Sequence, residues 1–203
     1  MSVEPTRLSG HIIDLEPLSW NHLDDLTIAA KYDDVWTYLD EPTPQTEEPV
    51  AALISEAISE QEQGLRLPFA IIARETKKAI GSISYIDIQR KHYAVELGWA
   101  WVTPSHWRTG AAREAAYLLI EHAFEVLGAI RVAFKTDSRN IRSQRAISGL
   151  GATKEGVFRN HRILRDGHIR HSVYYSIIRE EWPSVRQAVR SRQSAYTATQ
   201  DAH

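Results

Sequence analysis

The sequence predicts a single α/β domain, and three observations support that prediction. The chain has 203 residues, of which 43% are hydrophobic, so it can form one sizeable core with little room for a second. Segments that alternate apolar and polar residues are interspersed with segments of helical periodicity. One apolar strand, over residues 94–102, ends before Pro104 and leads directly into a helix N-terminus. We expect one domain over residues 1–192 and a flexible tail over residues 193–203.

The first third of the chain predicts one strand and two helices. Residues 11–18 alternate as a strand does, and Ser19 is a suitable N-cap for a helix over residues 20–30. A proline-containing linker follows. Thr46 can cap a second helix, whose apolar positions recur at helical spacing until Gly64 ends it.

The middle of the chain predicts an antiparallel meander. Residues 67–74, 79–89 and 93–102 each read as a strand, and short polar turns join them. The remaining elements follow in order: a strand over residues 130–136, a short helix over 141–150, strands over 154–164 and 169–178, and a final helix within 180–192 that starts near Trp182.

The junction after Pro104 has the properties of an anion-binding turn. The first N–H groups of a helix lack intrahelical partners and lie at the positive end of its dipole, so a phosphate can accept several hydrogen bonds there. The helix itself is marked by apolar residues at three- and four-residue intervals and by Gly128 as a C-cap. Small residues keep the turn open, and polar ones flank it: Gly110, Ala111 and Ala112, with Arg108, Thr109 and Arg113.

Composition excludes several classes of function. A formal net charge of −2 without a long Lys/Arg cluster argues against nucleic acid as a partner. No apolar run has the length of a membrane span, and residues 1–10 lack a signal-peptide core, so we expect no membrane partner and a cytoplasmic protein. With no cysteine there is no thiolate zinc site. The histidines at 161, 168 and 171 are spread over a turn, and we predict no metal.

Four runs of residues, in this order, resemble the GNAT N-acetyltransferase superfamily and its branch of ribosomal-protein N-terminal acetyltransferases. They are ELGW at 96–99, PSHWRTGAAREA at 104–115, NIRSQR at 140–145 and VYYSIIREEWP at 173–183. The resemblance covers nearly the whole chain. It implies a mixed, mostly antiparallel sheet of about seven strands, split at an acetyl-CoA site, with helices on both faces.

The same resemblance implies which residues hold acetyl-CoA. The strand before the turn would present free N–H groups to the thioester, and the turn would bind the pyrophosphate. The implied contacts are Trp101, Val102 and Thr103 on the strand, Trp107, Arg108, Thr109, Gly110, Ala111, Ala112 and Arg113 at the turn, and Asn140 and Ser143 on the short helix.

Glu96 and Ser143 are the catalytic candidates. Glu96 lies within an apolar strand, where desolvation disfavours the charged carboxylate and makes it a stronger base; alternatively it only bonds backbone groups at the split. Ser143 would hydrogen-bond the departing thiolate, and the alternative makes Asn140 and Ser143 ordinary helix-capping residues. Ile147 stands where many members of the superfamily have a tyrosine proton donor.

Two walls are predicted for the acceptor groove. Trp36 and Tyr38 precede the proline-containing linker on one side, although core packing is the alternative for aromatic residues. Arg159, Arg162 and Arg165 lie on the final hairpin. These arginines are either a solvated surface or a site for a carboxylate, in which case an anionic acceptor or an acidic acyl-CoA is favoured over a polyamine.

The resulting expectation is an enzyme that transfers an acetyl group from acetyl-CoA to a primary amine, either a protein N-terminal α-amine or a small-molecule amine, as a monomer or homodimer. Direct transfer in a ternary complex is implied. Two alternatives remain: a CoA-binding regulatory or interaction module with weak or lost catalysis, and an acyltransferase that uses another donor such as succinyl-CoA.

Overall fold

The computed structural model describes residues 1–189 and 191. Within that part of the chain, one sheet of eight strands has the order β1-β2-β3-β4-β5-β6-β8-β7. The strand beyond the predicted seven is β1 (Leu8–Ser9), which pairs with β2 (Ile13–Pro17). Two residues are too few to show a strand pattern, so no periodicity could indicate β1.

The predicted meander is confirmed. β3 (Leu67–Ala73), β4 (Ala79–Gln89) and β5 (Ala94–Val102) pair antiparallel in sequence order, and β2 lies on the far side of β3. All seven residues of β3 are buried because helices cover both faces of the sheet at this strand.

The sheet opens between β5 and β6 (Arg131–Asp137). These two strands run parallel and pair only over Ala94–Leu97 of β5. Beyond that point β5 continues to Val102 and β6 to Asp137 without pairing to each other, and Trp99 adopts a φ of 50° where the register of β5 with β4 shifts. This opening, which we call the β5–β6 split, lies where the resemblance implied a split in the sheet.

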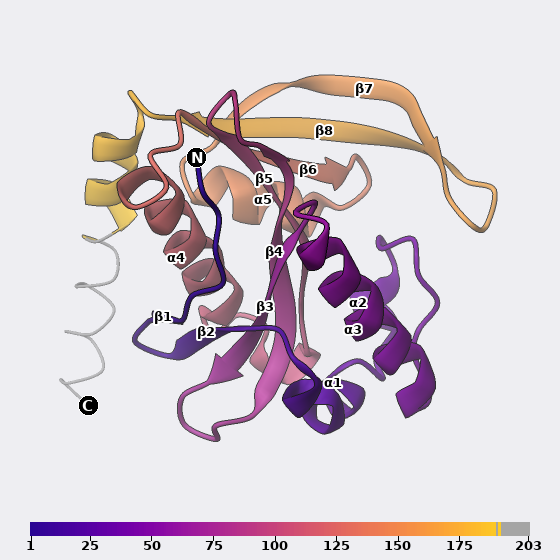
Figure 1. Ribbon diagram of the computed structural model, residues 1–203. Helices are drawn as coiled ribbons and strands as arrows, with labels where there is room; N and C mark the ends of the chain where they lie inside the picture. Colours follow the sequence, from indigo (N-terminus) through magenta and orange to yellow (C-terminus); the bar gives the residue numbers. More distant parts are fainter. Residues whose placement is uncertain (190, 192–203) are drawn as a thin grey trace, which may run out of the picture.

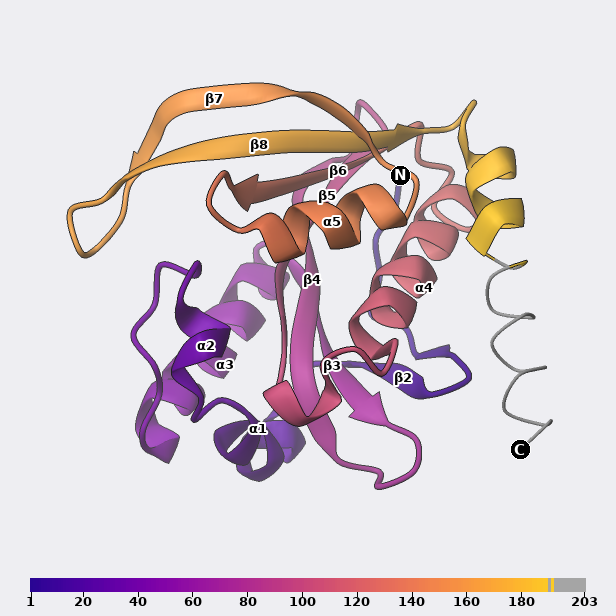
Figure 2. The ribbon, with the colours of Figure 1, turned by 180° about the vertical axis from the view of Figure 1, so that it is seen from behind.

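Helices cover the two faces of the sheet unequally (Figures 1 and 2). Over β2–β5 they form two separate cores, one on each face. On the first face lie α4 (Ala111–Glu125) and α5 (Ile141–Gly149), and on the second lie η1 (Trp20–His22), α1 (Leu23–Ala29), α2 (Asp33–Trp36) and α3 (Glu47–Glu62).

Some helix boundaries differ from those predicted. The helix predicted over 20–30 is a 3₁₀ turn, η1, followed by α1, and the four-residue α2 is too short for periodicity to reveal. Another 3₁₀ turn, η2 (Pro104–His106), precedes the predicted anion turn. Residues 182–189 are helical, as expected. Residue 190 and residues 192–203, which include the predicted tail, lie outside the described residues.

The last two strands form a long hairpin that reaches past β6 toward α2 (Figure 1). β7 (Thr153–Ile163) pairs with β8 (Ile169–Ile178), and their register shifts between Phe158 and Arg162. At its tip, the backbone N–H of Arg165 donates to the Asp40 carboxylate over 2.8 Å. The hairpin therefore touches the loop that follows α2 and closes one end of the space between them.

No helix in the described part of the chain is long and apolar enough to cross a membrane.

Candidate active site

The turn into α4 has the open backbone that the sequence predicted. Gly110 is the N-cap of α4 with a φ of 97°, a left-handed conformation that strains any residue with a Cβ. A Cβ there would also meet Ile12 Cδ1 at 3.3 Å. Among the described residues no acceptor takes the backbone N–H groups at five positions: Arg108, Thr109, Gly110, Ala112 and Arg113.

Trp107 and Ala111 have no free N–H donor for an anion. The backbone N–H of Trp107 donates to Pro104 O over 3.0 Å, and its indole Nε1 donates to Val102 O over 2.7 Å. The N–H of Ala111 donates to Thr109 Oγ1 over 3.3 Å. These two backbone N–H groups are thus engaged within the turn itself, and a cofactor contact by Trp107 and Ala111 stays a prediction. Trp107 joins the turn to the end of β5, and the Arg142 guanidinium lies 3.8 Å from its ring centroid.

Only one of the three donors predicted on β5 faces the split. The N–H of Thr103 donates to Ile80 O of β4 over 2.8 Å and so faces away from the split; a cofactor contact by Thr103 stays a prediction. Successive N–H groups of a strand point to opposite sides, so that of Trp101, which pairs with Ser82, also faces β4. The N–H of Val102 is left to point toward the β5–β6 split.

Glu96 is buried and ion-paired. It is 5% exposed, and Lys135 Nζ lies 3.0 Å from Glu96 Oε1. Glu96 is aligned with Ala133 of β6, two residues before Lys135, and its neighbours Val95 and Leu97 pack into the core of α4. Because side chains alternate along a strand, Glu96 and Lys135 lie on the face opposite α4 and α5.

A cluster on β7 and β8 extends the polar surface around this ion pair. Tyr174 lies opposite Lys135, whose Nζ is 5.7 Å from the centre of its ring. The ring of Phe158 packs against Tyr174, and His161 Nδ1 lies 2.9 Å from Ser172 Oγ. Burial, and then the negative charge of Glu96, raise the pKa of Tyr174, so its hydroxyl stays protonated.

His161 belongs to this cluster. Burial, followed by the charges of Arg162, Lys135 and Arg170, lowers the pKa of His161. His171 Nδ1 accepts the Asn160 N–H over 2.8 Å, on a different contact. Among the described residues no group of three metal-ligating side chains comes together.

Of the two candidates at the start of α5, Asn140 caps the helix and Ser143 has a free hydroxyl. Asn140 is the N-cap of α5, and its Oδ1 accepts the Ser143 N–H over 3.0 Å, which is the capping role given as the alternative. The hydroxyl of the half-buried Ser143 has no partner among the described residues. Ile147 is 9% exposed and packs in the core, so that position supplies no proton donor.

The walls of the predicted groove lie on the face of Glu96. Trp36 is 4% exposed, donates Nε1 to Ala30 O over 2.6 Å, and lies 5.5 Å from the ring of Trp101. It packs in the core, as the alternative has it, and supports this wall from behind; its contact with the acceptor stays a prediction. Tyr38 is half-exposed, with the Arg139 guanidinium 5.8 Å from its ring.

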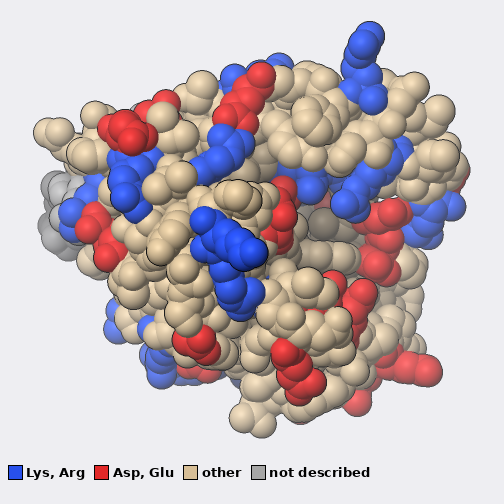
Figure 3. Space-filling model, turned by 45° about the horizontal axis from the view of Figure 1, so that its top comes forward, with Lys and Arg blue, Asp and Glu red and all other residues tan. Residues whose placement is uncertain are grey.

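A hollow lies below the β7–β8 hairpin, bordered by acidic and basic side chains (Figure 3). Sequence reasoning missed Lys135, Tyr174 and Arg170 on this face. Alternation along β6 and β8 was the available signal, but it does not say which strands become neighbours. Arg159 makes no hydrogen bond or ion pair with this cluster in the described part of the chain.

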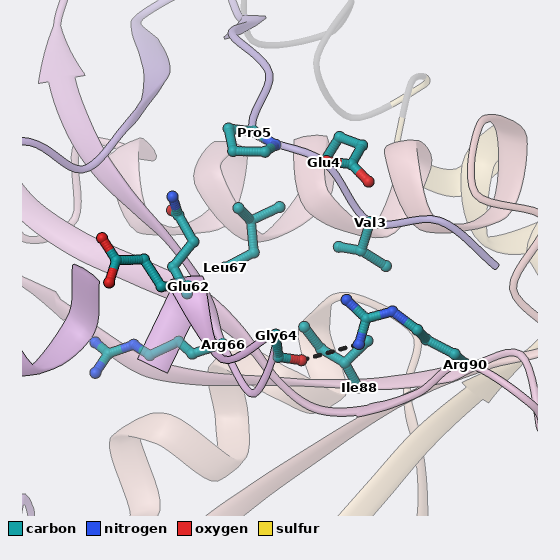
Figure 4. A pocket seen from close by; sticks show the side chains of 10 residues that line it. Val3, Glu4, Pro5, Glu62, Gly64, Arg66, Leu67, Ile88 and Arg90 are labelled. Atoms are coloured by element: carbon teal, nitrogen blue, oxygen red, sulfur yellow. Dashed lines mark hydrogen bonds between the residues drawn. The ribbon is translucent and has the colours of Figure 1, made fainter. Parts of the chain in front are cut away.

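Another pocket, of about 310 Å³, contains none of the predicted site residues. The N-terminal residues Val3 and Pro5 cover it, and Arg90 at its rim donates to Gly64 O over 2.9 Å (Figure 4). Arg66 extends away from it and donates Nε to Ser84 Oγ over 2.9 Å. Because this pocket holds none of the predicted site residues, the candidate active site is the β5–β6 split.

Known proteins share this fold and these motifs. The family model described as an acetyltransferase (GNAT) domain matches residues 13–153. The uncharacterised N-acetyltransferase YoaA of Bacillus subtilis is 31% identical over 123 residues, which are 61% of this chain and 67% of that protein. A solved structure from T. thermophilus, assigned as an acetyltransferase, is 40% identical with a TM-score of 0.85, covering 95% of this chain and 99% of the other.

RimL, a ribosomal L7/L12 α-N-protein acetyltransferase, has the same fold. Its TM-score is 0.76 at 19% identity, over 86% of this chain and 94% of its own. The resemblance that the four sequence runs indicated is thus confirmed for the family and the fold. The chain belongs to the GNAT acetyltransferase family and is an acyltransferase enzyme.

Proposed function

We propose that the protein transfers an acetyl group from acetyl-CoA directly to a primary amine within a ternary complex. The observation that supports this most is the β5–β6 split, which connects the open turn before α4 with the face that carries Glu96. The amine is a protein N-terminal α-amine or a small-molecule amine. A cytoplasmic location, a monomer or homodimer, and the absence of nucleic acid among the partners stay predictions.

The turn fits the phosphates of CoA. The unpartnered N–H groups converge on the N-terminus of α4, where the helix dipole also favours negative charge. Arg108 and Arg113 are exposed beside them and form no ion pair with any described residue. Acetyl-CoA would supply the activated thioester, and the Val102 N–H would donate to its carbonyl in the split.

Glu96 is the general base in this proposal. Its ion pair with Lys135 holds the carboxylate in place on this face, where it would accept a proton from the amine, directly or through water. The free Ser143 hydroxyl would donate a hydrogen bond to the sulfur. Ile147 supplies no proton donor to the leaving thiolate. Tyr174 has a protonated hydroxyl, but it lies opposite Lys135 on the Glu96 face, so we assign it to the acceptor groove.

Donor binding is tested at Arg113. Acetyl-CoA should raise the Tm of the wild type, and Arg113→Ala should weaken acetyl-CoA binding by about 10-fold, the loss of one charge-assisted hydrogen bond. Lys91→Ala, an exposed lysine in the β4–β5 turn, is the matched control and should bind like the wild type. A wild type that acetyl-CoA does not stabilise would refute the donor assignment.

Catalysis is tested at Glu96. Release of free CoA should depend on an added amine, and Glu96→Gln should lower kcat by about 10²- to 10⁴-fold while acetyl-CoA still raises the Tm. An unchanged kcat would remove Glu96 from the base role. Donor binding without turnover across a broad amine panel would overturn the proposal in favour of a CoA-binding module.

A further inference from the structure

The face around Glu96 has more basic than acidic side chains. Its two buried carboxylates already have cationic partners: Glu96 is ion-paired with Lys135, and Asp137 accepts from Arg139 Nη2 over 2.8 Å. Burial alone would raise the pKa of Asp137, but the hydrogen bonds from Arg139 outweigh it and lower that pKa. Asp137 and Glu96 also act on Arg170 through their charge, but neither forms an ion pair or hydrogen bond with Arg162 or Arg170 in the described part of the chain.

Arg162 and Arg170 are the other cations on this face. They lie directly opposite each other on β7 and β8. Arg170 is half-buried and donates Nε to Oγ of Ser172, which is fully buried, so its guanidinium is held in place while its two terminal nitrogens have no partner in the described chain. Arg162 is exposed and forms no ion pair there.

This juxtaposition is unfavourable in the protein alone. Like charges directly opposite each other across two strands destabilise a sheet. Burial, and the nearby charge of Arg162, lower the pKa of Arg170, while Asp137 and Glu96 raise it. A bound anion between the two guanidinium groups would remove the repulsion and fill the free donors.

The pair lies where the acceptor would enter. Arg170 is on the same face as Ser172 and Tyr174, since alternate residues share a face, and Tyr174 lies opposite Lys135. The open turn before α4 belongs to the other side of the split. An anion at Arg162 and Arg170 therefore approaches Glu96 from the acceptor side.

Resting on the proposed function, we propose that Arg162 and Arg170 bind a carboxylate of the acceptor, so that the preferred substrate is an amine that also carries a carboxylate, such as an amino acid or a peptide. This narrows the predicted arginine set. Arg170 joins it, while Arg159 and Arg165 are left out because neither contacts this cluster; Arg165 uses its backbone N–H to hold Asp40.

The experiment compares matched acceptors. Amino acids with an ω-amine and chains of one to six methylenes are assayed against their neutral amides, with acetyl-CoA as donor. At the best length the acid should exceed its amide by about 10- to 100-fold in kcat/KM, mostly through KM, as expected for charge-assisted hydrogen bonds made equally in substrate and transition state.

Substitutions test whether Arg162 and Arg170 cause the preference for the acid. Arg162→Gln and Arg170→Gln should each reduce the acid-over-amide ratio to about threefold or less, through a loss of kcat/KM with the acid. Arg170→Lys keeps the charge and should retain part of the ratio. Lys154→Gln, an exposed cation on the same hairpin that pairs opposite Tyr175, is the control and should keep the full ratio.

Two results would overturn the inference. One is equal use of acids and amides by the wild type; the other is a ratio that the arginine variants leave intact. A preference for succinyl-CoA over acetyl-CoA that disappears in these variants would assign the pair to the donor instead. Failure of the proposed function is distinct, because no amine would then release CoA.

Discussion

Glu114, in the first turn of α4, ties the N-terminal segment to the turn that we assign to CoA. The carboxylate is 5% exposed and accepts three backbone N–H groups, from His11 at 2.7 Å, Ile12 at 2.8 Å and Ile13 at 2.9 Å. Oε1 takes the first and Oε2 takes the other two. The side chain of Ile12 also lies beside Gly110, so this N-terminal segment packs directly against the turn.

Replacing Glu114 by alanine should cost about 2–4 kcal/mol of unfolding free energy. The loss comes mainly from the N–H of Ile13, which is buried and left without an acceptor at about 1–3 kcal/mol, with smaller losses at the exposed His11 and Ile12, whose N–H groups water can reach. For a chain of this size that corresponds to a fall in Tm of roughly 4–16 °C.

Glu114→Gln separates the two oxygens. The amide oxygen can keep the bonds to Ile12 and Ile13, while its NH₂ group faces the N–H of His11, so the cost should be only about 1 kcal/mol. Urea unfolding followed by tryptophan fluorescence measures both variants. Glu62→Ala, an exposed glutamate at the end of α3, should stay within about 0.5 kcal/mol of the wild type. The reasoning holds that the hydrogen bonds to Oε2 contribute most of the stabilisation. A loss below about 1 kcal/mol for Glu114→Ala, or equal losses for the two variants, would refute it.

Three further substitutions test packing and pH dependence. Burial lowers the pKa of His122 from 6.5, so below about pH 6.5 the unfolded chain takes up a proton that the folded chain resists; the Tm should fall more between pH 7.5 and 5.5 in the wild type than in His122→Gln. Gly81→Ala places a Cβ within 2.1 Å of Trp101 O, and chemical denaturation should show a loss of about 2 kcal/mol or more, together with weaker acetyl-CoA binding as β5 shifts. Trp182→Ala removes a ring stacked 5.3 Å from Phe124 and a bond to Glu125, and should cost about 3–5 kcal/mol by the same assay; a smaller loss would mean that the last helix is dispensable.

Local chemistry allowed much of the fold to be predicted. β4 begins and ends at the predicted residues because an apolar, alternating run is bounded by polar turns at both ends. The left-handed Gly110 and the capping Asn140 follow from what helix ends require. By contrast, β1 and α2 are too short to show a periodic pattern of apolar residues. β1 forms because it pairs with β2, and α2 because Val35 and Trp36 pack in the core with α1 and α3.

The site was harder to predict because its contacts join distant residues. The Glu96–Lys135 pair depends on the parallel register of β5 and β6, and 39 residues separate the two side chains. Trp36 and Tyr38 are both aromatic and two positions apart, yet Trp36 packs in the core between the sheet and α3, while Tyr38 is half-exposed. For Thr103, sequence gives no sign that Ile80 takes its N–H.

The β5–β6 split also has a kinetic consequence. The unpaired stretch between β5 and β6 opens the sheet from one face to the other. The donor would lie against α4 and α5, and the acceptor against the opposite face beside Glu96. Each ligand would then enter from its own face of the sheet, so neither would block the other. Under the proposed function, this arrangement would allow either ligand to bind first, and the acylated amine and free CoA would leave from opposite faces of the sheet.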